Sequence, residues 1–143
     1  MSQELPVDRQ KALDNLLDHY HRPRNRGPMF QPDVIARGGD VGCGDIVTIY
    51  VKVDGTGECI EQVTFEGEGC TISQAAASIL TEIAVGKRLA EIDAMDFDDM
   101  IDLLGREVVH TRRQPATLAL GTLKTAINQY RMSKRRAELN GGD

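Results

Sequence analysis

Residues 46–53 read IVTIYVKV, and they are followed by DGTG at residues 54–57 and by CIEQVTFE at residues 59–66. The first stretch is dense in β-branched residues and has the length of a strand. Asp and Gly tolerate the backbone angles of a tight turn, so the second stretch predicts a turn. The third stretch predicts the partner strand, with Val63 and Phe65 on one face. Because two strands alone are marginally stable, we expect helices to cover one face of this hairpin.

The flanking segments predict those helices. Leucine and tyrosine side chains form an apolar stripe at helical spacing, which predicts a helix over residues 7–20. The stripe consists of Leu13, Leu16, Leu17 and Tyr20. A second helix is predicted to start at Cys70 and to end before Gly86. A short acidic helix over residues 97–104 and a long one from Pro115 to about Arg136 follow, because proline is tolerated in a first helical turn. Residues 29–42 are rich in turn formers and predict an irregular segment, with a third strand near Val34 and Ile35.

This order of elements predicts an α+β fold, a small three-stranded antiparallel sheet packed with helices on one side. A length of 143 residues predicts a single domain over residues 1–143, with a flexible tail at 137–143. No apolar run is long enough for a membrane span, and the N-terminus lacks a basic and then apolar signal pattern. A net charge of −5 and only 4% aromatic residues disfavour nucleic-acid binding. The odd number of cysteines, 3, favours reduced thiols in a cytoplasmic setting.

Two cysteines stand beside glycines at the predicted element boundaries. Cys43 lies in GCGD at residues 42–45, directly before the first long strand, and Cys70 ends GEGC at the start of a helix. A helix N-terminus favours the thiolate form of a cysteine, and glycine lets a ligand approach the backbone closely. Asp45 adds a carboxylate to the two sulfurs, and zinc and iron–sulfur clusters accept that mixture of donors. The residue types alone fit two small buried cysteines beside tight turns equally well.

The chain resembles the NifU/IscU/SufU family of iron–sulfur cluster assembly proteins. The resemblance covers nearly the whole chain and rests on an ordered set of motifs: LDHY at 17–20, PRN at 23–25, CGD at 43–45, FEGEGC at 65–70, SQAAAS at 73–78 and ATLA at 116–119. It implies an IscU-type fold, a small antiparallel sheet with helices. It also implies that Cys43, Asp45 and Cys70 bind a transient iron–sulfur cluster, iron or zinc.

The chain departs from the family pattern at the third cysteine of that site. Pro115 occupies the position, and Gln114 stands where the family usually has Lys or His. Proline has no ligand atom in its side chain but suits a first helical turn. This residue is therefore compatible with the fold, but it removes the thiol that would bind metal or accept sulfur. In the family, the missing cysteine is implicated in accepting persulfide sulfur and in closing the metal site. Three ligands leave one position open, whereas a structural zinc site normally has four protein ligands.

Three further residues are weighed as replacements or partners in the site. Cys59 is interpreted as a small residue on a strand face, because an extended strand and a loop separate it from Cys70. His110 is interpreted as a solvated loop residue that could also swing toward the site. His19 matches a family position in the first helix, and we expect it to pack or to form hydrogen bonds.

Three segments of the chain are rich in charged residues. Each of the two basic segments has two interpretations, and the acidic segment has one. The basic run at residues 21–26 predicts either a docking site for the acidic surface of a cysteine desulfurase or a solvated turn. Arg112 and Arg113 either stabilise a thiolate at the site or lie on the surface. The acidic run at residues 91–102 lacks calcium-loop spacing and predicts a solvated helix face.

Two functions follow from these patterns. The first is a non-enzymatic iron–sulfur cluster scaffold or sulfur-relay protein that works with a cysteine desulfurase and supplies apo recipient proteins. The second, favoured by Pro115, is a degenerate relative with a weak or absent metal site that acts as an adaptor or regulator. A thiol enzyme using Cys70 lacks a visible histidine partner. We expect no nucleic-acid or membrane partner, and either a monomer or a weak homo-oligomer.

Overall fold

The computed structural model of the protein describes residues 4–40, 42 and 44–141. Within these residues, strand β2 (Asp45–Val53) is the centre of a three-stranded sheet. Strands β1 (Val34–Asp40) and β3 (Ile60–Glu68) pair with its two edges, both antiparallel. Alternate β2 side chains are buried, which is the pattern of a sheet with one face on the core. The predicted α+β class with a three-stranded antiparallel sheet is confirmed.

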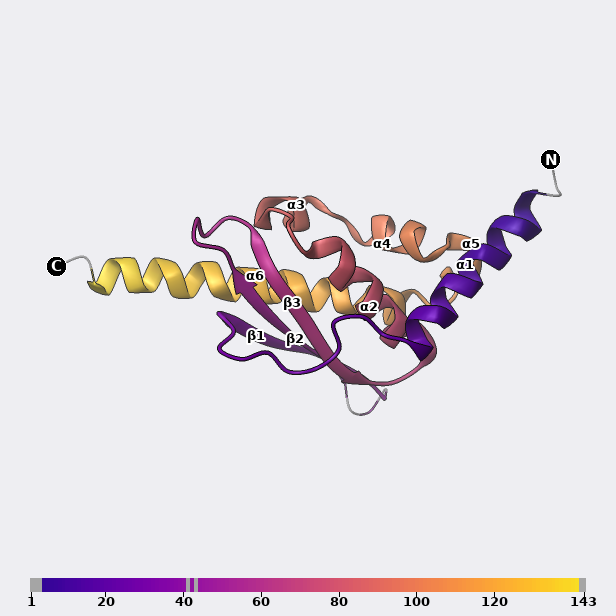
Figure 1. Ribbon diagram of the computed structural model, residues 1–143, viewed down its shortest axis with the longest axis horizontal. Coiled ribbons are helices and arrows are strands. Elements are labelled where there is room, and N and C mark those ends of the chain that lie inside the picture. The colour runs from indigo at the N-terminus through magenta and orange to yellow at the C-terminus, as the bar shows by residue number, and fades with distance from the viewer. Residues whose placement is uncertain (1–3, 41, 43, 142–143) are drawn as a thin grey trace.

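The helices gather on the buried face of the sheet, as Figure 1 shows. Helix α2 (Thr71–Ala84) packs against β3, and α6 (Arg113–Gly141) packs against β1, β2 and α2. Helix α1 (Glu4–His21) lies on α2, and α4 (Phe97–Leu104) lies on α6. Two short helices, α3 (Leu89–Ala94) and α5 (Arg106–Val109), complete the described elements. Helices therefore cover one side of the sheet, as expected.

Small side chains allow α2 to lie close to its neighbours. Ala75, Ala76 and Ala77 are completely buried in the middle of this helix. After α2, Gly86 has a φ of 86°, a left-handed conformation that glycine adopts at low cost and that ends the helix as predicted. The position of α2 matters for function because its first residue directly follows Cys70.

The main differences from the prediction concern β1, the start of β3, two short helices and the end of α6. Residues 38–40 belong to β1 rather than to an irregular loop, since they pair with residues 45–47 of β2. Cys59 lies just outside β3 and forms an isolated bridge with Arg88. Helices α3 and α5 were not predicted, because each is short and shows too few turns for a clear period. Helix α6 ends at Gly141 rather than near Arg136, so residues 137–141 of the expected tail are helical.

The extra turn of α6 begins with Ala137, Glu138 and Leu139, which have high helix propensity, and Asn140 and Gly141 follow at its end. Among the helices of the described residues, none has both the length and the apolar character that crossing a membrane requires.

Candidate functional site

The two ends of a hairpin bring Asp45 and Cys70 together. Asp45 is the first residue of β2, and the β2–β3 register places Ile46 opposite Glu68, the last residue of β3. Only Gly69 separates that strand end from Cys70, which caps the N-terminus of α2 with an extended backbone. Antiparallel pairing therefore juxtaposes two residues that lie 25 positions apart in the sequence.

Hydrogen bonds hold the Asp45 carboxylate against the start of α2. Its Oδ1 accepts the backbone N–H of Cys70 at 2.8 Å and the hydroxyl of Ser73 at 3.0 Å. Gly69 has a φ of 146°, and a Cβ at this position would lie 2.2 Å from Asp45 Oδ1. Glycine is thus required at position 69 for the carboxylate to approach this closely. Asp45 thus supplies a side-chain acceptor at the start of a helix whose N-cap residue, Cys70, makes no side-chain cap hydrogen bond.

The surroundings of Asp45 favour its ionised form. Partial burial on its own would raise the pKa of Asp45, but the hydrogen bonds from Cys70 and Ser73 outweigh that effect and lower the pKa below its usual value. The Cys70 side chain and the positive charge of Arg112 add to this lowering. Arg112 therefore lies within electrostatic range of the Asp45 carboxylate. Arg113 instead binds Asp98 of α4 at 2.9 Å.

The donors at this site are a carboxylate and a half-buried thiol, which are types that zinc and iron both accept. Across residues 4–40, 42 and 44–141, no group of three His, Cys, Asp or Glu residues is placed to hold a metal ion. Cys43, the remaining predicted ligand, lies outside the described residues. The chemistry of the pair thus fits a metal, and the described chain contributes two donors to it.

Pro115 occupies the first turn of α6, where proline was predicted to fit. Its side chain is buried, whereas Gln114 beside it is exposed. Proline cannot donate a backbone hydrogen bond, and the first turn of a helix does not require one. The structure therefore explains how this position keeps the helix start without a cysteine.

Neither of the other candidate ligands joins the site. Cys59 lies before the start of β3 and Cys70 after its end, and a 9-residue strand spans about 27 Å. His110 is exposed, and its Nδ1 lies 3.0 Å from the carbonyl oxygen of Arg106. The interpretation of Cys59 as a residue remote from the site and of His110 as a solvated residue agrees with these positions.

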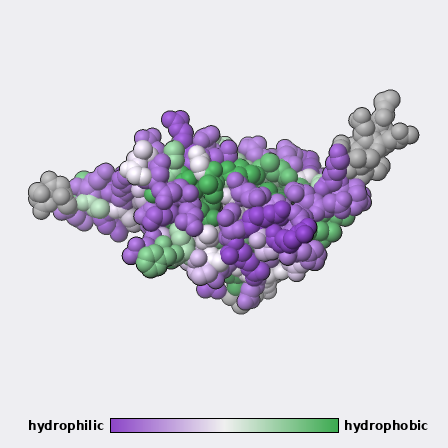
Figure 2. Space-filling model, in the orientation of Figure 1, coloured by the Kyte–Doolittle hydropathy of each residue, from purple (hydrophilic) through white to green (hydrophobic). Residues whose placement is uncertain are grey.

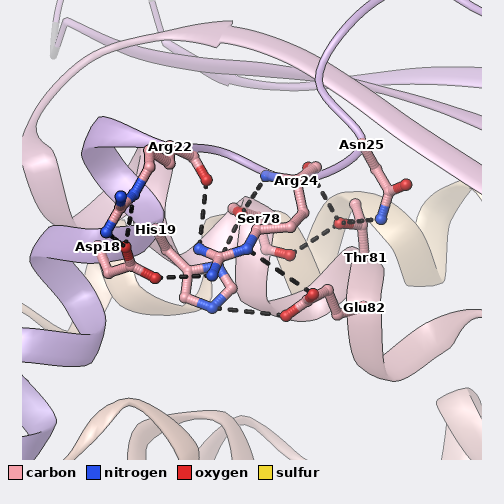
Figure 3. Close-up of polar contacts among 8 residues, drawn as sticks. All are labelled: Asp18, His19, Arg22, Arg24, Asn25, Ser78, Thr81 and Glu82. Atoms are coloured by element: carbon pink, nitrogen blue, oxygen red, sulfur yellow. Dashed lines mark hydrogen bonds and ion pairs between the residues drawn. The ribbon is translucent and has the colours of Figure 1, made fainter.

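A second polar cluster joins the end of α1 to α2 (Figure 3). His19 is buried, and its Nδ1 lies 2.7 Å from Ser78 Oγ, which also accepts the backbone N–H of Arg24 at 2.8 Å. The other ring nitrogen of His19, Nε2, lies 3.5 Å from a carboxylate oxygen of Glu82. This geometry confirms the hydrogen-bonding role expected for His19.

The same cluster engages two arginines of the basic run. Arg22 and Arg24 each lie 2.6 Å from an oxygen of Asp18, and Arg24 also lies 3.8 Å from Glu82 (Figure 3). The charges of Arg22 and Arg24 are therefore already paired within the chain.

The acidic run of residues 91–102 lies along α3 and α4. Every carboxylate in it is exposed, as predicted.

We expect His19 to make the protein less stable in acid. Burial, together with the charge of Arg24, lowers the pKa of His19 below its ordinary value of 6.5, and Glu82 and Asp18 only partly oppose this. Between the lowered pKa and 6.5 the unfolded chain binds more protons, so the free energy of unfolding falls as the pH drops through that window. Urea titrations at a series of pH values should show a smaller pH dependence for His19→Gln than for wild type.

The matched control is His110→Gln, which removes an exposed histidine and should keep the wild-type pH dependence. An equal pH dependence in His19→Gln and wild type would show that His19 does not contribute to acid sensitivity.

Sequence reasoning did not single out Ser73 or Ser78, although both lie in the quoted motif of residues 73–78. Both are buried and bonded to residues far away in the sequence, namely Asp45 and His19. The available signal was a polar residue on an otherwise apolar helix, because a buried hydroxyl needs a partner.

Comparison with known proteins identifies relatives of this chain. The family described as "NifU-like N terminal domain" matches residues 11–137. The zinc-dependent sulfurtransferase SufU of Bacillus subtilis is 32% identical over 120 residues, which cover 76% of this chain and 80% of the relative. The iron–sulfur cluster assembly scaffold protein IscU of Escherichia coli K12 is 34% identical over 128 residues, or 87% of this chain and 97% of the relative.

Solved structures agree with the fold. A crystal structure of a putative SUF-system scaffold protein from Fervidobacterium islandicum superposes with a TM-score of 0.65 at 25% identity, covering 80% of this chain and 94% of that one. The N-terminal part of a NifU-like protein from Brucella abortus has the same fold, with a TM-score of 0.71 at 18% identity over 90% of this chain and 98% of that one.

Proposed function

The chain belongs to the NifU-like N-terminal domain family, and on that basis we propose that it is a scaffold for iron–sulfur cluster assembly. The observation that carries the proposal is the contact between the Asp45 carboxylate and the N-terminus of α2 at Cys70. In that contact the Asp45 carboxylate accepts the backbone N–H of Cys70 at the end of the sheet, which supports a site built from this carboxylate and the Cys70 thiol. Relatives whose names describe iron–sulfur scaffolds and a zinc-dependent sulfurtransferase align over most of the chain.

We assign Asp45 and Cys70, together with Cys43, as the residues that hold the cargo. Cys43 is assigned from the sequence alone, two positions before Asp45. A carboxylate is a harder donor than a thiolate, so a site with Asp45 releases soft iron–sulfur cargo more readily than an all-cysteine site. When present, the metal supplies a Lewis-acidic centre that binds sulfur. The protein groups position it: Gly69 and Ser73 hold the carboxylate, and Arg112 adds a positive charge.

We propose a cysteine desulfurase as the sulfur donor, apo iron–sulfur proteins as recipients, and a cytoplasmic location. The relatives are named as a sulfurtransferase and a cluster assembly scaffold, and such roles require a sulfur donor and a recipient. Reduced thiols support the third, because Cys59 and Cys70 are both free and the length of β3 separates them. We propose a carrier rather than an enzyme, and a sulfurtransferase role is the alternative that the SufU relative suggests.

A second function, that of an adaptor or regulator without a stable metal, is favoured by Pro115. This residue removes the third sulfur that the family places at the opening of the last long helix. Under this alternative the chain would bind the desulfurase through an intact fold and carry no cargo of its own.

Two measurements distinguish the functions. Metal analysis of the purified full-length chain tests for zinc and iron, and anaerobic reconstitution with ferrous iron and sulfide tests for a cluster by its optical absorption. The scaffold function predicts retained metal or a visible absorbing cluster, both lost in Cys43→Ala. If neither metal is retained and Cys43→Ala changes nothing, the scaffold proposal fails and the adaptor function holds.

A further inference from the structure

An open apolar groove of about 670 Å³ lies between α2, α3 and α4, away from the candidate site. In Figure 2 it appears as the green band in the upper middle of the molecule, surrounded by hydrophilic purple surface. Its lining includes apolar side chains of all three helices, namely Ile83, Ala94, Met95 and Leu103. Leu103 is 46% exposed, which is a large fraction for a leucine beside other apolar side chains.

Acidic groups surround the groove. Its lining carries three carboxylates, Glu91, Asp99 and Asp102, against one cation, Lys87. Asp102 is paired with Arg106 at 2.8 Å. Glu91 and Asp99 accept only backbone N–H groups, and no cation in the described part of the chain forms an ion pair with either. The groove therefore favours an apolar segment that also carries positive charge.

The last turns of α6 have this chemistry. Leu139 is 80% exposed, and Arg135 and Arg136 lie one turn before it on the same side of the helix. Neither arginine has an ion-pair partner among the residues that the structure describes. Figure 1 shows this end of α6 extending beyond the sheet and the other helices.

The helix cannot fill the groove of its own chain. Helix α6 is continuous from Arg113 to Gly141, and Arg131 is already bound to Asp93 of α3. A continuous helix does not turn back on itself, so its last turns can reach such a groove only in another molecule.

We propose that the C-terminal end of α6 docks into the α2–α3–α4 groove of a second copy of this chain. Leu139 enters the apolar groove beside Leu103, while Arg135 and Arg136 face Glu91 and Asp99. In a two-fold symmetric dimer each chain contributes one groove and one helix end, so both contacts form together and the assembly closes. The buried surface is small, so the dimer is weak and depends on concentration.

The interface is separate from the proposed scaffold site. Cys70 directly precedes α2 and Ile83 lies near the end of this helix, about 20 Å away along its axis. Disrupting the dimer should therefore leave metal content and cluster reconstitution unchanged, and failure of one proposal does not entail failure of the other.

Sedimentation velocity of the full chain over a concentration series tests the proposal. Wild type should form a dimer whose dissociation constant rises with NaCl between about 50 mM and 500 mM, because salt screens the ion pairs. Leu103→Gln and Leu139→Gln should each weaken the dimer about 100-fold, since every symmetric dimer carries the change twice. Phe30→Gln is the matched control, because Phe30 is 85% exposed on a loop outside both surfaces.

Mixing the two variants gives the sharpest result. A mixed dimer of Leu103→Gln and Leu139→Gln contains one intact groove facing one intact helix end, so it should be tighter than either variant dimer. Leu139→Gln changes a solvent-exposed side chain and keeps the test valid if Leu103→Gln disturbs the fold. The proposal is overturned if wild type stays monomeric at all concentrations, which would leave the groove to another partner. It is also overturned if Phe30→Gln weakens the dimer as much as the two leucine variants do. A mixture of the two leucine variants that dimerises no more tightly than either variant alone would overturn it as well.

Discussion

Replacing Cys70 with alanine is expected to lower the affinity for zinc by more than about 100-fold, since even residues that only support a metal ligand cost about 10–100-fold when they are lost. Cys70 is one of the two donors that the structure brings together, and its thiol has no substitute among the described residues. Alanine loses the contact of the Cys70 side chain with Asp45 but keeps the hydrogen bond from the backbone N–H. The fold should therefore survive, and a competition titration with a coloured chelator would measure the loss.

Cys59→Ala provides the matched control for that experiment. Cys59 is also a free, half-buried cysteine, but it lies at the opposite end of β3. It should bind zinc with the affinity of wild type. Equal affinities for Cys70→Ala and Cys59→Ala would exclude Cys70 as a ligand.

Pro115→Cys is expected to raise zinc affinity at least tenfold, or about 1.4 kcal/mol, because it adds a further thiolate to an incomplete site. Pro115 follows Arg112 by three residues, and the charge of Arg112 acts on the Asp45 carboxylate. This electrostatic effect supports a position of the start of α6 near the site. Affinity is best measured by the same chelator titration on variants purified without metal.

Pro115→Ser separates the added thiol from the loss of proline. Serine resembles cysteine in size but is a poor ligand for zinc, so this variant should bind like wild type. If serine and cysteine at position 115 give the same affinity, then position 115 does not face the metal.

The hairpin and the helices that cover it were predictable because each depends on local patterns. β-Branched residues at 46–53, a turn at 54–57 and apolar stripes at helical spacing all lie within short windows. The sequence pattern failed to predict the end of β1, because Gly38 and Gly39 are typical of a loop. In the structure both glycines belong to the strand, because they pair with β2. Short helices such as α3 and α5 depend on tertiary packing rather than on their own period.

The sequence alone determined the residue types of the site, the family motifs and the substitution at Pro115, since these are properties of a linear order. Only the tertiary structure decided that Asp45 Oδ1 accepts the Cys70 N–H at the start of α2, and that Ser73 supports it. It also decided that the charge of Arg112 acts on Asp45, whereas Arg113 pairs with Asp98 of α4. Only the structure showed that Cys59 and Cys70 lie beyond opposite ends of β3, and that an open groove lies between α2, α3 and α4. The reason is physical: strand register and helix packing set distances between residues that are remote in sequence, and no local pattern encodes those distances.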